Sequence, residues 1–523
     1  LKPNSRRKFY RLYIAALRLD CAGDSDHSDE VMRGILAFCL VALSLAERAD
    51  DLVTELPGFP PASAWGFKVY SGLLRVPGPV CGYDALIIHY QFHTSQQDPA
   101  KDPVLIWHQG GPGGSSIDIG LYGEMGAFQV GDKEHGNYLN PYAWNKVANM
   151  LYLESPAGSG QGMGFSQCIK DGKVATCSWD DKSQAEAYSH TLLEFFSGFP
   201  EYAQNAFYLT GESYFGQYGP NIAHFILNNE PFKSKINLKG IAAGNACWGG
   251  TDSCVACNGP SEEKVDVDLY FGKALFSPKL KAAIDKECTF PTDYKDACSG
   301  TSTLSATCKQ LLLEMRRQVG PHNIYNIYDN CERTQKFLEI VGQNEDWLLQ
   351  ELRQGLHNPS ATREALLNMS GGYDWDCNGD IGAWIRSPEV RKALHLDSAG
   401  GSGSDFRYET SGPASVLLWP ELAAKIRVLI YNGDADACVP YNGNEDWILS
   451  LEDQGVLKET APWTPWFTKN KASPAGYITK YQSPGATVDF TFATIRLAGH
   501  MAPTFQPEAS LVMLAKFLHG DAL

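Results

Sequence analysis

One serine of this chain, Ser213, stands in a position that favours nucleophilic chemistry. It lies in the stretch Gly-Glu-Ser-Tyr, at the corner between a strand-like run (206–209) and a helix-like run. A sharp strand-to-helix turn exposes a serine hydroxyl, and the N–H groups at the start of the helix can stabilise an oxyanion. A serine that only caps the helix is the alternative interpretation. The preceding residue, Glu212, places a carboxyl group beside the hydroxyl.

An acid and a histidine follow Ser213 in the order that a catalytic triad of the α/β-hydrolase type requires. Asp434 and Asp436 lie in the loop after the strand-like run KIRVLIYNG, and either could be the acid. His500 follows another strand-like run, DFTFATIRLAG. The one later histidine, His519, ends an apolar helical run, where an interaction with the helix dipole is the favoured interpretation. The order Ser, Asp, His therefore supports the nucleophile interpretation.

Strand-like runs that alternate with helix-like runs must position these residues. The alternation predicts an α/β sheet with functional loops at the strand ends. Together with the serine turn and the order Ser, Asp, His, it indicates an α/β-hydrolase fold with a mixed, mostly parallel sheet flanked by helices. Between residues 247 and 385 the pattern changes to helix-like segments rich in cysteine, which indicates an inserted, disulfide-stapled, mainly helical cap. Its crowded cysteines are Cys247, Cys254, Cys257, Cys288, Cys298 and Cys308. The Cys254-x-x-Cys257 pair has no zinc-spaced second pair, so disulfides are favoured over a zinc site.

The start of the chain and its overall charge indicate export. Residues 32–49 combine a charged start, the apolar run GILAFCLVALSLA and small residues, which is typical of a signal peptide; a buried helix is the alternative. Residues 1–31 are then expected to lie outside the fold. The net charge of the 523-residue chain is −16, which argues against nucleic acid and anionic membranes as partners. Asn368 is a predicted glycosylation site.

A calcium site is not predicted, although Asp374 begins a stretch that is similar to a calcium loop. The twelfth position of such a loop requires a bidentate glutamate, and Ile385 stands there. No cofactor or metal is therefore expected.

Six motifs in this order along the chain resemble those of the serine carboxypeptidases, from about residue 51 to the end. They are WHQGGPGGSS, YLESPAG, GESY, SPEVRKALH, YNGDAD and AGHMAPT. The resemblance implies a triad of Ser213, Asp436 and His500, and an oxyanion hole formed by the backbone N–H groups of Gly111 and Tyr214. It also implies further site residues: Gln109, Gly110, Glu124 and Glu212 for binding a substrate carboxylate, Met501 for the side-chain pocket, and a Cys288–Cys331 disulfide.

The resemblance implies a serine-type carboxypeptidase that acts on peptides with a free C-terminus at acidic pH, in a lysosome, a vacuole or the extracellular space. An acyltransferase on the same scaffold and an inactive protective or binding homologue are the alternatives. The expected organisation is a core from 50–246 and 386–523 with the cap at 247–385, and a homodimer stays open. After removal of the signal peptide no membrane contact is expected.

Three residues depart from the family pattern. Gln109 replaces an asparagine, Gly114 replaces a cysteine, and Phe215 replaces a small residue just after the nucleophile. The longer Gln109 is expected to require a displaced loop, and the ring of Phe215 is expected to require local repacking.

Overall fold

The computed structural model describes residues 50–131, 136–160, 164–252, 255–259, 262–291, 304–329, 381–396, 403–468 and 473–520. From Leu52 onward the chain forms one compact unit. The predictions for residues 1–31, the signal peptide at 32–49, Cys331, Asn368 and Asp374 lie outside the described residues.

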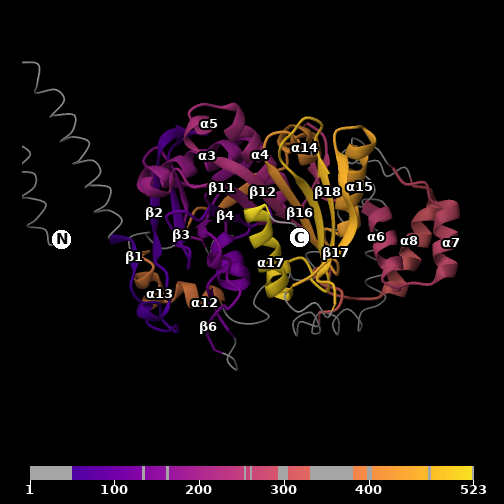
Figure 1. Cartoon of the computed structure of the whole chain (residues 1–523), viewed down its shortest axis with the longest axis horizontal. Helices are drawn as coiled ribbons and strands as arrows, with labels where there is room; N and C mark the ends of the chain where they lie inside the picture. Colours follow the sequence, from indigo (N-terminus) through magenta and orange to yellow (C-terminus); the bar gives the residue numbers. More distant parts are fainter. Residues whose placement is uncertain are drawn as a thin grey trace, which may run out of the picture. The chain divides into compact units, whose positions relative to one another are not determined.

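A 13-stranded sheet forms the centre of the described part of this unit (Figure 1). The main path runs in the order β1-β2-β3-β7-β4-β11-β12-β16-β19-β18-β17, with β8 and β9 attached to β3. The strands are β1 (Leu52–Val53), β2 (Val69–Val80), β3 (Tyr83–His93), β4 (Val104–His108), β7 (Asn149–Leu153), β8 (Gln167–Lys170), β9 (Lys173–Ala175), β11 (Phe207–Glu212), β12 (Leu238–Gly244), β16 (Arg427–Gly433), β17 (Lys458–Trp466), β18 (Gly476–Gln482) and β19 (Phe490–Ile495).

Six neighbouring strands of this sheet, from β7 to β19, run parallel to one another. The outer strands β2, β3, β17 and β18 pair in antiparallel fashion. Every residue of β4, β11 and β19 is buried, as expected for parallel strands that are covered on both faces. The carboxyl ends of parallel strands meet at one edge of a sheet, which brings the loops after β11, β12, β16 and β19 together.

Helices cover both faces of the sheet. On one face lie α3 (Asp181–Gly198), α4 (Phe215–Asn228), α14 (Trp419–Ala423) and α15 (Tyr441–Asp453). On the other lie η2 (Ser116–Met125), which is π-helical, and α17 (Pro507–His519). Alternate residues of β4 serve the two faces, because Ile106 joins the first core cluster and Leu105 joins the second.

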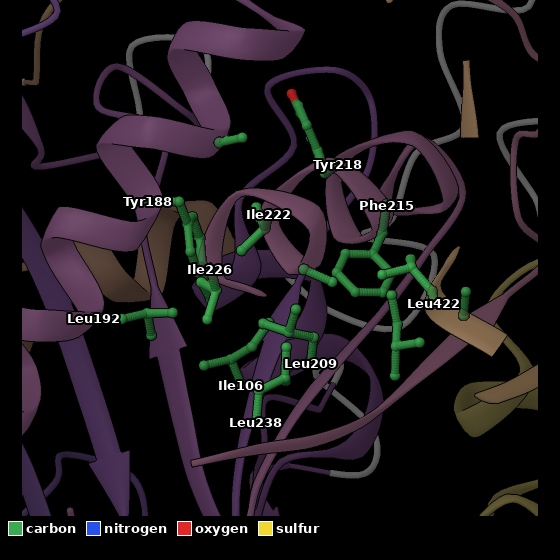
Figure 2. Packing of buried hydrophobic residues seen from close by; sticks show 14 of the residues in the cluster. Ile106, Tyr188, Leu192, Leu209, Phe215, Tyr218, Ile222, Ile226, Leu238 and Leu422 are labelled. Atoms are coloured by element: carbon green, nitrogen blue, oxygen red, sulfur yellow. The ribbon is translucent and has the colours of Figure 1, made fainter. Parts of the chain in front are cut away.

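The packing between β4, β11 and the helices of the first face is shown in Figure 2. Leu192 of α3 and Ile222 of α4 pack in one cluster with Ile106 and Leu209 of the two strands. The first nine residues of α4, 215–223, are all buried, so the start of the helix that follows Ser213 is packed on every side. The α/β-hydrolase fold predicted from the sequence is confirmed.

The described part of the cap contains three helices, α6 (Glu262–Gly272), α7 (Pro278–Glu287) and α8 (Ala306–Val319), which form a small core of their own (Figure 1). Ser277 and Ser305 cap α7 and α8, since their side-chain oxygens accept backbone N–H groups. A further helix, α12 (Ile381–Arg386), lies at the end of the predicted cap but packs into the second core cluster.

The predicted disulfide between Cys288 and Cys331 is wrong, because Cys288 is bonded to Cys308. Cys288 ends α7 and Cys308 lies in the first turn of α8, so the two packed helices bring their Cα atoms to 5.0 Å. Cys257 is bonded to Cys247, which confirms the disulfide interpretation over a zinc ligand for Cys257. A third disulfide joins Cys168 and Cys177.

Candidate active site

Ser213 lies at the turn between β11 and α4, as the sequence predicted. Its φ of 63° falls in the left-handed region, where a non-glycine residue is strained unless its surroundings hold it. The surroundings do so here: the Ser213 N–H donates to the Gly244 carbonyl at 2.9 Å, and the Ser213 carbonyl accepts from the N–H groups of Gly216 and Cys247. The backbone of Gly110 also lies against the turn, since a Cβ on Gly110 would stand 2.6 Å from the Cβ of Ser213.

His500 and Asp436 form a buried pair in the loops after β19 and β16. The His500 Nδ1 lies 2.7 Å from the Asp436 Oδ2, and both side chains are at most 1% exposed. Burial disfavours the charged ring, but the Asp436 carboxylate and its hydrogen bond raise the pKa of His500 above its usual value. The Asp436 carboxyl group also accepts the backbone N–H groups of Cys438 and Val439.

Asn245 connects this pair to the serine, and the sequence analysis did not identify it. It follows β12 with a φ of 40°, and its side-chain amide donates to the Asp436 Oδ2 at 2.7 Å. The side-chain oxygen of Asn245 accepts the Gly433 N–H at 3.0 Å. The neighbouring Gly244 holds the Ser213 N–H, so four adjacent strand ends carry Ser213, Asn245, Asp436 and His500. A polar residue after a strand is a weak signal on its own, and no spacing along the chain selects this one.

The competing acid and histidine have other contacts. Asp434 accepts the Leu497 N–H at 2.7 Å and lies 3.6 Å from the Lys273 ammonium. His519 is the last residue of α17, which fits the dipole interpretation. The geometry therefore favours Asp436 and His500 for the triad.

A pair of buried carboxyl groups lies beside the nucleophile. Glu212 ends β11 and Glu124 lies in η2, and both are nearly inaccessible, at 1% and 4%. The Gln109 Nε2 donates to the Glu212 Oε1 at 2.6 Å, and the Gln109 Oε1 accepts the Trp107 indole N–H at 2.8 Å. The carboxyl groups of Glu124 and Glu212 also interact directly with each other, and Gln109 lies beside both.

Burial disfavours ionisation of this pair. Burial raises the pKa of Glu212 to about 7. Burial and the neighbouring Glu212 carboxyl raise the pKa of Glu124 well above its usual range. Below neutral pH Glu212 is therefore protonated, and its carboxyl group can donate a hydrogen bond.

Two loops present the backbone N–H groups predicted to form the oxyanion hole. Gly111 lies in the glycine-rich loop after β4, and Tyr214 follows Ser213. The two loops are in close contact, because a Cβ on Gly110 would stand 2.5 Å from the Tyr214 nitrogen. The Tyr218 hydroxyl accepts the Gly113 N–H at 3.2 Å and thereby joins the glycine-rich loop to α4. This arrangement can stabilise an oxyanion at Ser213.

Asp181, at the start of α3, supports the same region and was also missed from the sequence. Its carboxyl group accepts the hydroxyl groups of Tyr214 and Tyr408 at 2.9 and 2.8 Å, and the N–H groups of Ser411 and Gly412 at 2.6 and 2.7 Å. Burial raises the pKa of Asp181, although these four donors act in the opposite direction. A buried carboxylate at a helix start is common, so only its partners reveal this role.

The three departures from the family pattern fit together in the structure. Gly114 lies against Gln109, because a Cβ on Gly114 would stand 2.9 Å from the Gln109 Cγ. Phe215 is fully buried between Gly211 and Gly219, since a Cβ on either glycine would stand within 2.5 Å of its ring. Met501, predicted for the substrate pocket, is buried beside His500 at the start of α16 (Ala502–Phe505).

A family model described as serine carboxypeptidase matches residues 57–520. The chain belongs to the serine carboxypeptidase family. Among similar proteins, the lysosomal protective protein of Mus musculus is 31% identical over 509 residues, which cover 92% of this chain and 97% of that protein. Serine carboxypeptidase 1 of Hordeum vulgare is 30% identical, over 90% of this chain and 93% of that protein.

The fold is similar to that of KEX1(DELTA)P, a prohormone-processing carboxypeptidase from Saccharomyces cerevisiae. The TM-score is 0.61 at 20% sequence identity, with 91% of this chain and 97% of that chain covered. At this level of sequence identity the similarity shows the fold alone.

Proposed function

We propose that the protein is an acid serine carboxypeptidase that releases C-terminal amino acids from peptides through an acyl-enzyme on Ser213. The Ser213 hydroxyl attacks the carbonyl carbon of the last peptide bond while His500 accepts its proton. The oxyanion binds the backbone N–H groups of Gly111 and Tyr214. His500 then protonates the departing amine, and water attacks the acyl-enzyme by the reverse sequence of proton transfers.

The observation that carries this proposal is the buried carboxyl pair beside the nucleophile. A hydrolase that only cleaves esters or internal peptide bonds has no need of Glu124 and Glu212 in a site that disfavours their ionisation. A substrate's terminal carboxylate would supply the acceptor that the protonated pair requires, and we propose that Gln109 and the Gly110 N–H complete its binding site. The scissile bond of a bound peptide then lies one residue away from the carboxylate, which accounts for release of a single residue.

The pH dependence follows from the same groups. As pH rises through about 7, Glu212 ionises and repels the substrate carboxylate. His500 must be neutral to act as base, so activity falls at low pH as the ring becomes protonated. The two effects give a bell-shaped profile with its alkaline limb at the carboxyl pair.

The test is the release of amino acids from one peptide as the free acid and as the C-terminal amide, with k_cat/K_M measured from pH 4 to pH 8. We expect strong preference for the acid below neutral pH and loss of that preference as pH rises. Equal cleavage of acid and amide would contradict the carboxylate site. Transfer of an acyl group to an added alcohol in preference to water would favour an acyltransferase, and no reaction with a fluorophosphonate would favour an inactive homologue.

We further propose that the protein is exported to a lysosome, a vacuole or the extracellular space. Three disulfides among the described residues support an oxidising compartment, and one relative carries the name lysosomal protective protein. None of the described helices is long and apolar enough to cross a membrane. The chain supplies every group of the proposed mechanism, so the proposal requires no cofactor.

A further inference from the structure

A short segment of the cap, residues 323–327, contacts both loops that carry the acid and the base of the triad. It follows α8 and has the sequence Asn-Ile-Tyr-Asn-Ile. The Ala437 N–H donates to the Ile324 carbonyl at 2.8 Å, and the Ile327 N–H donates to the Ala435 carbonyl at 3.0 Å. The segment therefore pairs with the residues on both sides of Asp436.

The same segment holds the histidine. The His500 N–H donates to the Tyr325 carbonyl at 2.7 Å. The Tyr325 ring lies edge-on to the imidazole, with ring centroids 5.1 Å apart and an interplanar angle of 68°. Gly499 permits this approach, since a Cβ there would stand 2.1 Å from the Tyr325 carbonyl oxygen.

Two buried asparagines give the segment its shape. The Asn323 Oδ1 accepts the Tyr325 N–H at 2.9 Å, and the Asn326 Oδ1 accepts the Tyr328 N–H at 3.0 Å. Both are side-chain bonds to a backbone N–H two residues ahead, a turn that asparagine favours. Asn323 and Asn326 are 6% and 4% exposed, so water does not readily replace these bonds.

We infer that residues 323–327 are a positioning element of the triad, so that this segment of the predicted cap sets the Asp436–His500 geometry. This inference rests on the proposed function. The hydrogen bonds of the segment to Ala435, Ala437 and His500 join backbone groups and involve no reacting atom. It acts by fixing the backbone of two loops whose side chains must stay aligned, and a displacement of about 1 Å in such a group can lower turnover about a hundredfold.

The experiment compares the double variant Asn323→Ala/Asn326→Ala with the wild type and with Ser305→Ala. Ser305 caps α8 through the Cys308 N–H, so its loss weakens the same cap without a contact to either triad loop. End-point labelling with a fluorophosphonate counts the active sites, and k_cat is expressed per labelled site. We expect k_cat of the double variant to fall about tenfold to a hundredfold while K_M changes by less than about threefold. Ser305→Ala should keep the wild-type k_cat per site.

Graded replacements separate positioning from folding. Serine keeps a side-chain oxygen but forms this turn more weakly than asparagine, so k_cat per site should fall in the order Asn, Ser, Ala at position 326. Wild-type k_cat per site in the double alanine variant, or an equal loss in Ser305→Ala, would overturn the inference and leave the proposed function intact. A wild-type protein that does not react with the fluorophosphonate would instead remove the proposed function.

Discussion

Replacing both buried carboxyl groups with amides, in the variant Glu124→Gln/Glu212→Gln, tests the proposed carboxylate site directly. Glutamine keeps a hydrogen-bond donor of similar size but does not titrate. The wild type should bind a free-acid peptide well at low pH and poorly at high pH, whereas the variant should bind it with little dependence on pH. Its activity near pH 5 should drop only modestly, because the donors remain.

The size of the effect follows from the pKa of Glu212. With a pKa of about 7, this carboxyl is roughly nine-tenths ionised at pH 8 and almost fully protonated at pH 5. If only the protonated form binds the substrate carboxylate, ionisation of Glu212 should lower kcat/KM for the free-acid peptide about tenfold from pH 5 to pH 8. Ionisation of Glu124 would add to the loss. The amide peptide should lack charge-assisted bonds worth about 1.5–3 kcal/mol each at low pH.

The same variant changes the stability. A carboxyl whose native pKa is raised stabilises the fold below its unfolded pKa, and that contribution is lost as pH rises through the native pKa. At about 1.4 kcal/mol per pKa unit, the shift of Glu212 from 4.5 to about 7 corresponds to about 3 kcal/mol in the free energy of unfolding. The wild type should lose this stability as pH rises between those two values, and the variant should not.

The assay measures k_cat/K_M from pH 4 to pH 8 for one peptide as acid and amide, with thermal unfolding recorded at each pH. The single variants Glu124→Gln and Glu212→Gln serve as matched controls, since each leaves one titrating group. An alkaline limb of the same midpoint and slope in the double variant would refute the reasoning, because another group would then cause the loss of binding.

Three further predictions concern the residues that hold the reacting groups. Ser213→Ala and His500→Ala should each lower k_cat by about a million-fold, since triad members act as a unit; more than a tenth of wild-type activity in either variant would contradict the assignment. Asp436→Asn should lower k_cat far more than Asp434→Asn, and the reverse result would move the acid to Asp434. Asp181→Asn should lower kcat more than it raises KM, because an amide side chain cannot accept all four of the hydrogen bonds that position Tyr214. An unchanged kcat at wild-type stability would exclude a positioning role for Asp181.

The sequence predicted the fold and the triad because both leave strong local signals. Buried parallel strands give largely apolar runs, such as VLIWH in β4, and functional residues follow such strands at their ends. Ser213 stands directly after β11, and Asp436 and His500 follow β16 and β19 within a few residues. The order of strands in the sheet then brings them together without further information.

Other parts of the site depend on contacts between distant segments, which no local pattern reveals. Asn245 binds Asp436 across 191 positions of the chain, and Asp181 binds Tyr408 across 227. The wrong disulfide has the same origin. Cys288 was assigned a partner by likeness to the family, whereas the pairing depends on how α7 and α8 pack in this chain.

Two of the departures from the family pattern show that the effect of one residue depends on its neighbour in space. Gln109 is one methylene longer than asparagine, and that methylene lies where a side chain on Gly114 would stand. The loss of the cysteine at position 114 therefore provides the room that the longer amide needs, and the amide still reaches Glu212 at 2.6 Å. A Cβ at position 114 would also stand 2.9 Å from the Gly110 carbonyl oxygen, so we expect Gly114→Ala to destabilise this loop even when residue 109 is small.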